Sequence, residues 1–283
     1  MPPSSEGGIF LLSILSVRLA LLCYTYYMKS YIVGNWKMNL SVGDSSVYLH
    51  KLLQRTRAYR DVEVIVAPSV VALQPLSLQT DRKKIRLAAQ TANPHDFGPY
   101  TGEVSCTQLR GLVDYCLVGH PDRRELFHES DRRIRDTVAA AVRNQITPIL
   151  SLGETATEHT FGESRDVIAD QLLGGLANVS IEDLDKVIIA YEPVWAISTT
   201  TDAHLASPED VAETVKYLRT ILADTYNAEV AANMPILYGG SVTPASAGAY
   251  LTIPGVNGIV IGEASLIADH FIDIIEIAKR VIS

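Results

Sequence analysis

Apolar and polar residues repeat along the chain as one unit: a short apolar run, a polar loop, and a longer stretch whose apolar residues recur every three or four positions. The longer stretches, such as residues 131–145 and 208–226, have the spacing of amphipathic helices. Ser207 and Pro208 are a typical N-cap and first helical residue for the second of these. The short runs predict strands at residues 30–34, 62–67, 85–89, 115–119, 147–152, 186–191, 235–239 and 257–262.

Near-continuous apolar strands that alternate with helices indicate a parallel sheet buried on both faces. Eight such units after residue 27 predict an α/β fold, a single-domain (β/α)8 barrel over residues 28–283. A doubly wound open sheet is the structural alternative. Its nucleotide-binding versions lose support because no G-x-G-x-x-G follows the first run and no G-x-x-x-x-G-K-[ST] occurs.

The N-terminal segment differs from the repeating unit. Residues 9–23 are strongly apolar, but they are too few to span a bilayer comfortably and they include Arg18. The preceding residues contain a Glu and no basic residue, which is unlike a signal peptide. We therefore expect residues 1–27 to be a dispensable extension, or the result of a start codon assigned too far upstream.

The net charge, the cysteines and the histidines limit which partners, compartment and metals we expect. The net charge of −8 argues against a nucleic-acid surface or an anionic membrane, since both attract clusters of Lys and Arg. The three cysteines include no C-x-x-C pair, which favours reduced thiols in a cytoplasmic protein. The seven histidines form no metal-binding pattern, so we expect no metal.

Polar and ionisable residues follow nearly every predicted strand. Because the carboxyl ends of barrel strands meet at one mouth, these residues are expected to converge there and to form the functional site. Singly, each has a plainer interpretation: Lys37 as a surface lysine, His120 as a helix cap. The residues are Asn35, Trp36, Lys37, Gln90, His120, Glu154, Glu192, Gly240, Ser241, Gly262 and Glu263.

Two of these positions suggest particular chemistry. An imidazole at a helix N-terminus is kept neutral by the positive end of the helix dipole, so His120 suits an uncharged hydrogen-bond donor. The turns at residues 238–241 and 261–266 follow the last two strands, where barrels often bind phosphate.

Seven motifs in this order resemble the triosephosphate isomerase family across residues 28–283: GNWKMN (34–39), YTGEVS (100–105), VGH followed by RR (118–124), LGET (152–155), AYEPVWAI (190–197), YGGSV (238–242) and NGIVIG with ASL (257–266). The resemblance implies a cofactor-free isomerase that interconverts dihydroxyacetone phosphate and glyceraldehyde 3-phosphate in glycolysis and gluconeogenesis. It also implies a catalytic mechanism that uses a Glu base, a neutral His and a closing loop.

The resemblance assigns four catalytic residues. Glu192 would remove the proton beside the substrate carbonyl, and neutral His120 would donate a hydrogen bond to the carbonyl oxygen as the enediolate forms. Lys37 would add positive charge, and Asn35 would orient the same oxygens.

The resemblance also assigns the phosphate site and the lid. Backbone N–H groups of Ser198, Ser241, Gly262 and Glu263 would hold the phosphate, and closure of residues 193–201 would exclude water. A homodimer is implied as well, because residues 96–106 resemble the loop in which Thr101 reaches the partner's active site.

The chain departs from the family pattern beside His120 and in the lid. Pro121 and Asp122 stand where the family usually has Ser-Glu, which removes a hydroxyl from the resting base and shortens the carboxylate expected to pair with Lys37. Residues 198–200 replace Gly-Thr-Gly, and their β-branched threonines narrow the backbone choices of a hinge.

Two further departures lie at the phosphate site and beside the base. Glu263 replaces a glycine, and we expect its carboxylate to point outward so that only its N–H faces a phosphate. Ser151 replaces Cys, a nearly isosteric change whose effect we expect to be mild.

Two other functions stay open. One is isomerisation of a related short sugar phosphate such as a tetrulose phosphate; the other is a catalytically silent barrel that binds a phosphorylated metabolite. Retention of a base opposite an electrophile argues against the silent barrel.

Overall fold

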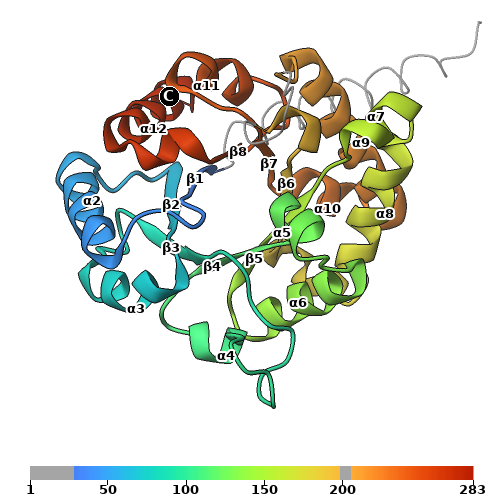
Figure 1. The fold of residues 1–283 in the computed structure, drawn as a ribbon. Helices are drawn as coiled ribbons and strands as arrows, with labels where there is room; N and C mark the ends of the chain where they lie inside the picture. Colours follow the sequence, from blue (N-terminus) through green and yellow to red (C-terminus); the bar gives the residue numbers. More distant parts are fainter. Residues whose placement is uncertain (1–28, 198–204, 283) are drawn as a thin grey trace, which may run out of the picture.

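A closed barrel of eight parallel strands forms the centre of the protein (Figure 1). The computed structural model describes residues 29–197 and 205–282. The strands pair in chain order and β8 pairs with β1, so the barrel prediction is confirmed and the open sheet was wrong. They are β1 (Ser30–Asn35), β2 (Val62–Ala67), β3 (Arg86–Ala89), β4 (Tyr115–Val118), β5 (Thr147–Leu152), β6 (Ile188–Tyr191), β7 (Ile236–Gly239) and β8 (Gly258–Ile261).

Helices surround the barrel, and Figure 1 shows them as an outer ring. Short 3₁₀ turns lie before or after the last strands: η1 (Ile181–Lys186), η2 (Val194–Ala196) and η3 (Glu263–Leu266). The helices are α2 (Val42–Arg55), α3 (Val70–Gln79), α4 (Cys106–Leu109), α5 (Pro121–Leu126), α6 (Asp131–Arg143), α7 (Ala156–Phe161), α8 (Ser164–Leu176), α9 (Pro208–Thr225), α10 (Ala228–Asn233), α11 (Pro244–Leu251) and α12 (Ala268–Ile282).

Side-chain caps define where the helices begin. Ser207 caps α9 as predicted: its hydroxyl accepts from the Asp210 N–H at 3.1 Å, and the Asp210 carboxylate accepts from the Ser207 N–H in return. Pro208 occupies the first turn, where its missing N–H leaves no intrahelical bond unmade. Such caps end the loops that follow the strands and so help to hold those loops in place.

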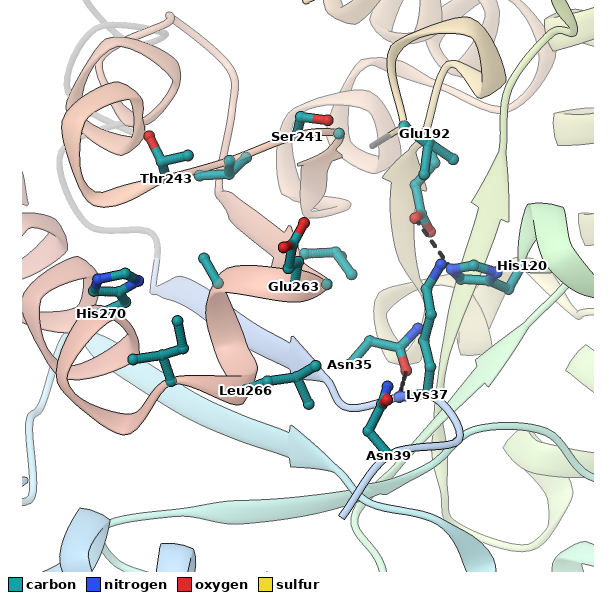
Figure 2. A pocket seen from close by; sticks show the side chains of 17 residues that line it. Asn35, Lys37, Asn39, His120, Glu192, Ser241, Thr243, Glu263, Leu266 and His270 are labelled. Carbon is teal, nitrogen blue, oxygen red and sulfur yellow. Dashed lines mark hydrogen bonds and ion pairs between the residues drawn. The ribbon is translucent and has the colours of Figure 1, made fainter. Parts of the chain in front are cut away.

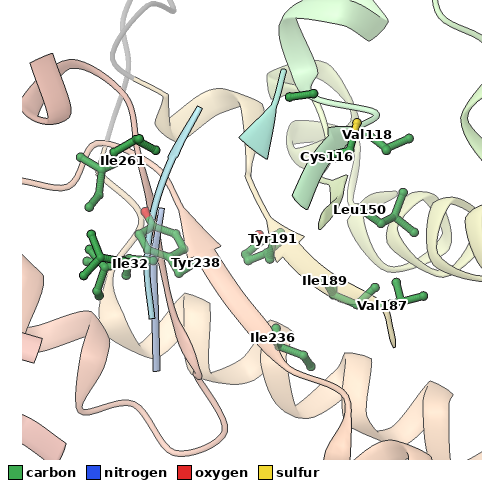
Figure 3. Packing of buried hydrophobic residues seen from close by; sticks show 14 of the residues in the cluster. Ile32, Cys116, Val118, Leu150, Val187, Ile189, Tyr191, Ile236, Tyr238 and Ile261 are labelled. Atoms are coloured by element: carbon green, nitrogen blue, oxygen red, sulfur yellow. The ribbon is translucent and has the colours of Figure 1, made fainter. Parts of the chain in front are cut away.

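Alternation along the strands divides the core into two layers. On β6, Ile188 and Ala190 face the barrel interior, while Ile189 and Tyr191 pack outward against the helices. Figure 3 shows part of the outer layer, where Tyr191 and Tyr238 lie on neighbouring strands. The strands are therefore buried on both faces, which is why their sequences read as continuous apolar runs.

Strand ends account for the small errors of the sequence prediction. The run 186–191 includes two residues that are not in β6, because Lys186 closes η1 and the Val187 N–H donates to the Leu184 carbonyl within that turn. An apolar run indicates which residues are buried, but it does not show which of them form the hydrogen bonds between strands. The expectations for residues 1–27 and 198–200 lie outside the described residues.

The described ranges contain no helix long and apolar enough to cross a membrane. Within the same ranges, no group of three or more His, Cys, Asp or Glu side chains is arranged to hold a metal ion. Cys106 and Cys116 are free and buried, and burial raises the pKa of the Cys106 thiol to about 11.

Candidate active site

A cavity of about 500 Å³ opens at the carboxyl end of the strands. It is lined by seven of the eight site residues predicted from the sequence; the eighth, Ser198, lies outside the described residues. The seven come from five strand exits, and the barrel brings them together although they are spread over most of the chain. They are Asn35, Lys37, His120, Glu192, Ser241, Gly262 and Glu263.

Glu192 is a nearly buried carboxylate directly after β6. Only 4% of the residue is exposed. Its Oε1 accepts a hydrogen bond from the Ser151 hydroxyl at 2.6 Å, and its Oε2 lies 3.6 Å from His120 Nε2. Figure 2 shows the carboxylate and the imidazole facing each other. Glu192 therefore lies at the barrel mouth rather than inside the core, where an uncompensated charge would be costly.

His120 has its ring fixed by the helix that it caps. Its Nδ1 accepts the Asp122 N–H at 3.1 Å in the first turn of α5, as the helix-cap interpretation predicted. A ring nitrogen that accepts a hydrogen bond carries no proton, so the neutral ring has its proton on Nε2. The imidazole therefore presents an uncharged N–H donor to the cavity and to Glu192.

Lys37 supplies the cation of the site, on a strained backbone. Its φ of 49° is in the left-handed region, which non-glycine residues seldom adopt. The conformation is held from both sides: the Lys37 N–H donates to Asn35 Oδ1 at 3.1 Å, and the Gln90 amide donates to the Lys37 carbonyl at 2.8 Å. Such strain is typical of functional sites, where surrounding contacts determine the geometry.

The Lys37 ammonium has a carboxylate partner in spite of the shortened side chain. Its Nζ lies 3.0 Å from Asp122 Oδ2, and the two side chains are 24% and 33% exposed. Asp122 thus contacts both Lys37 and, through its backbone N–H, His120. One helix turn therefore positions the cation and the imidazole together.

The turns after β7 and β8 form the opposite wall of the cavity (Figure 2). The Ser241 N–H and hydroxyl both donate to the Ala196 carbonyl at 3.1 Å, so this N–H must release Ala196 before it can bind a phosphate. Gly262 and Glu263 begin the η3 turn. Glu263 is exposed and borders the cavity; the direction of its carboxylate relative to a bound phosphate stays a prediction.

The chain after Glu192 is anchored by a second buried carboxylate. Glu154 accepts from Trp195 Nε1 at 2.8 Å and from the Tyr191 hydroxyl at 3.3 Å. His159 stacks on Trp195 with ring centroids 4.5 Å apart. Chiefly because of burial, and further because of Glu154, the pKa of Tyr191 is raised well above its usual value. The phenol therefore stays a donor and fixes the start of η2.

Comparison with known proteins decides the family. A family model described as Triosephosphate isomerase matches residues 30–278. This chain belongs to the triosephosphate isomerase family.

Three relatives named Triosephosphate isomerase illustrate the match. The Flavobacterium johnsoniae protein is 35% identical over 248 residues, which cover 87% of this chain and 98% of the relative. The Fusobacterium nucleatum protein is 37% identical over 246 residues, covering 87% and 97%. The Chloroherpeton thalassium protein is 36% identical over 253 residues, covering 89% and 99%. The family and fold expected from the motifs are confirmed, and the chain is an isomerase.

The sequence missed three residues of this triosephosphate isomerase family site. Asn39 and His270 line the cavity, and Ser151 contacts the base. Asn39 ends the quoted motif GNWKMN, which could have identified it, whereas His270 lies on α12 and carries no signal in the sequence. The sequence indicates only that Ser151 is nearly isosteric with Cys, because its hydrogen bond to Glu192 depends on the pairing of β5 with β6.

Proposed function

We propose that this enzyme interconverts dihydroxyacetone phosphate and D-glyceraldehyde 3-phosphate, with Glu192 as the base and His120 as the electrophile. The observation that carries the proposal is the neutral Nε2–H of His120 beside the Glu192 carboxylate, 3.6 Å away, at the edge of one cavity. A base and an uncharged donor side by side in one cavity suit removal of a proton beside a carbonyl.

The reaction is a proton transfer between two carbons of one substrate. Glu192 Oε2 takes a proton from the carbon next to the carbonyl, and the electron pair moves into an enediolate whose oxygen accepts the His120 hydrogen bond. Glu192 then returns the proton to the neighbouring carbon. At the same time the hydroxyl proton of the first carbon passes to the former carbonyl oxygen, so that hydroxyl and carbonyl exchange places. Because substrate and product are isomers, the step needs no oxidant or reductant.

Lys37 and Asn35 assist the two catalytic residues. The Lys37 ammonium attracts the anionic substrate, which matters because the protein itself carries a net charge of −8. It also stabilises the negative charge that develops on the enediolate oxygen. The Asn35 side chain, 5% exposed at the end of β1, orients the same oxygens and holds the Lys37 backbone.

The phosphate would bind at the turns after β7 and β8. Backbone N–H groups of Ser241, Gly262 and Glu263 are the proposed donors, with Ser198 as a fourth. Closure of residues 193–201 over the cavity would keep water from the enediolate. Release of the Ala196 carbonyl by Ser241 would couple phosphate binding to this closure.

A homodimer through the loop 96–106 is part of the proposal. The loop projects beyond the ring of helices near α4 (Figure 1), and its Phe97 side chain is exposed. Asn93 and Arg133 hold its base by binding Glu103. Thr101, at the exposed tip, would enter the partner's site.

Sedimentation measures the proposed dimer directly. We expect the parent protein to sediment as a dimer, and Thr101→Arg to sediment as a monomer with little turnover. Thr160→Arg, on the exposed face of α7, is a matched control and should stay dimeric. A monomeric parent protein would contradict the dimer and leave the chemistry untouched.

We further propose that the enzyme is cytoplasmic and that residues 1–27 are dispensable. The free buried thiols of Cys106 and Cys116 agree with a reducing compartment. A protein that begins at Met28 should match the full chain in turnover. Mass spectrometry of native protein with residues 1–27 attached would contradict the idea of a misplaced start codon.

One assay tests the reaction. Purified protein is given D-glyceraldehyde 3-phosphate, with erythrulose phosphate as the control substrate. We expect turnover of the triose phosphate that is lost in Glu192→Asp and in His120→Gln. Absence of turnover in the parent would defeat the proposal, and preference for the tetrulose phosphate would assign the related activity instead.

A further inference from the structure

The Glu192 side chain contacts a different neighbour with each carboxylate oxygen. Oε2 faces His120, and Oε1 faces Ser151 on the adjacent strand β5. Ser151 is fully buried, at 0% exposure, and its hydroxyl lies 2.6 Å from Oε1. A hydroxyl this close to a carboxylate is a short, charge-assisted donor, about twice as strong as a neutral one.

Strand β5 fixes Glu192 at a second point. The Glu192 N–H donates to the Leu152 carbonyl at 2.8 Å, one residue beyond Ser151. Backbone and side chain of Glu192 are thus both tied to consecutive residues of one strand. The bond to Leu152 restricts the backbone of Glu192, and the bond to Ser151 restricts the rotation of its carboxylate.

The space around Glu192 leaves little alternative for its side chain. A Cβ placed on Gly239 of β7 would lie 2.5 Å from Glu192 Cγ, and one on Gly153 would lie 2.1 Å from the Glu192 carbonyl oxygen. Gly239 on β7 therefore leaves room for the Glu192 side chain, and Gly153, directly after β5, leaves room for its backbone. The side chain lies against Gly239, and its two carboxylate oxygens meet Ser151 and His120.

The other groups near Glu192 do not replace this hydrogen bond. Pro121, directly after His120, has neither an N–H nor a hydroxyl to donate. The buried hydroxyl of Tyr238, on β7, makes no hydrogen bond to Glu192 in the part of the chain that the structure describes. Lys37 borders the same cavity, but its ammonium pairs with Asp122.

We infer that Ser151 is a positioning residue for the catalytic base: its hydroxyl holds Oε1, so that Oε2 faces His120 and the substrate. The inference rests on the proposed function for the role of Glu192, but the contact itself does not. It also revises the expectation that replacing Cys by Ser at this position is mild. The serine supplies a hydroxyl to the base in a site where Pro121 supplies none.

Substitution of Ser151 tests the inference through kinetics. A hydrogen bond to a charged group contributes enough that Ser151→Ala should lower kcat by roughly ten- to a hundredfold. KM should change little, because the hydroxyl does not touch the phosphate site. Ser151→Cys should recover part of the loss, since a thiol is a weaker donor of similar shape.

A double substitution separates positioning from packing. In the Glu192→Gln background, Ser151→Ala should cause no further loss of kcat, because the base on which it acts is absent. The matched control is Ser45→Ala in α2, whose hydroxyl is equally buried and unbonded among the described residues. This control should leave kcat and KM unchanged.

The possible outcomes distinguish the inference from the function. An active parent protein whose Ser151→Ala variant keeps the parent's kcat would overturn the inference and leave the function standing. A parent without triose phosphate turnover would overturn the function. The inference is then decided by a crystal structure of Ser151→Ala, or of Ser151→Cys if the alanine variant does not fold. A displaced Glu192 carboxylate supports positioning, and an unmoved carboxylate overturns it.

Discussion

Two carboxylates at opposite ends of the barrel are almost equally buried, yet their partners differ in kind. The Glu63 side chain, near the start of β2, is 10% exposed, and the Glu192 side chain, after β6, is 5% exposed. Glu63 binds the ammonium of Lys29 and the guanidinium of Arg86. Glu192 binds a serine hydroxyl and faces a neutral imidazole.

The charges at the start of the strands form a paired network. Arg86 bridges Glu63 at 2.9 Å and Asp114 at 3.1 Å, and Arg82 lies 3.5 Å from Asp114. Burial alone would lower the pKa of Arg86, but the carboxylates of Asp114 and Glu63 raise it above its usual value. Each carboxylate there lies against at least one cation, although the buried Oδ2 of Asp114 has no hydrogen-bond partner among the described residues.

The comparison indicates what makes a buried carboxylate reactive. Glu63 has both carboxylate oxygens against cations, whereas Glu192 has one oxygen on a serine hydroxyl and the other at the catalytic cavity beside a neutral imidazole. The two ends of one barrel thus use the same residue type for stability and for chemistry.

Glu192→Gln is expected to give the largest effect. It should lower turnover by about 10²- to 10⁴-fold, because the base is lost. The free energy of unfolding should not fall, since the amide can still accept the Ser151 hydrogen bond and no charge remains buried. Kinetics and urea unfolding of the same preparation measure both quantities. A large loss of stability would contradict the contrast with Glu63.

Glu63→Gln is the matched substitution at the other end, with the opposite expectation. The free energy of unfolding should fall by roughly 1–3 kcal/mol, because the nearly buried Glu63 side chain loses its charge-assisted bonds to Arg86 and Lys29. Turnover should stay near that of the parent. Urea unfolding gives the first quantity and the triose phosphate assay the second; an inactive but stable variant would show that the two ends are not separate.

Glu263→Gln tests a third carboxylate, at the mouth. Among residues 29–197 and 205–282, no cation forms an ion pair with Glu263. Because we expect the carboxylate to point away from the phosphate, the glutamine variant should keep the KM of the parent at every salt concentration. A KM lowered by about two- to fivefold at low ionic strength, with a difference that salt reduces, would show instead that the charge repels the substrate.

Cys106→Ser is expected to have a small effect, visible only in alkali. Burial, chiefly, raises the pKa of the Cys106 thiol from 9.0 to about 11, so the folded state retains a proton that the unfolded state releases. The stability it contributes is complete below pH 9 and is lost as pH rises towards 11. Unfolding free energies from pH 8 to 11 should therefore fall less steeply in the variant. Parallel curves for variant and parent would contradict this.

The strands and the converging residues could be predicted because their signal is local. Apolar runs mark strands buried on both faces, and residues after parallel strands share one mouth whatever their distance in sequence. Seven of the predicted site residues line one cavity for that reason. The motif resemblance then identified the family without the structure.

The unpredicted part of the site depends on contacts between strands. Ser151 and Glu192 are 41 residues apart, and only the pairing of β5 with β6 shows that their side chains meet. In the same way, the bond from Ser241 to Ala196 joins two turns whose sequences give no hint of it. Residue propensity and apolar spacing predict helices and strands one at a time. The hydrogen bonds between two strands can be predicted only when the register of their pairing is known.

The absence of a side chain at Gly239 has a consequence for how this protein can evolve. The backbone there would allow a side chain, and the obstacle is the Glu192 side chain itself. The two positions are therefore bound together: a descendant that keeps the acid must keep the glycine, whereas one that loses the acid is free to acquire alanine. Paired change at residues 192 and 239 would mark lineages of this barrel that have abandoned isomerisation.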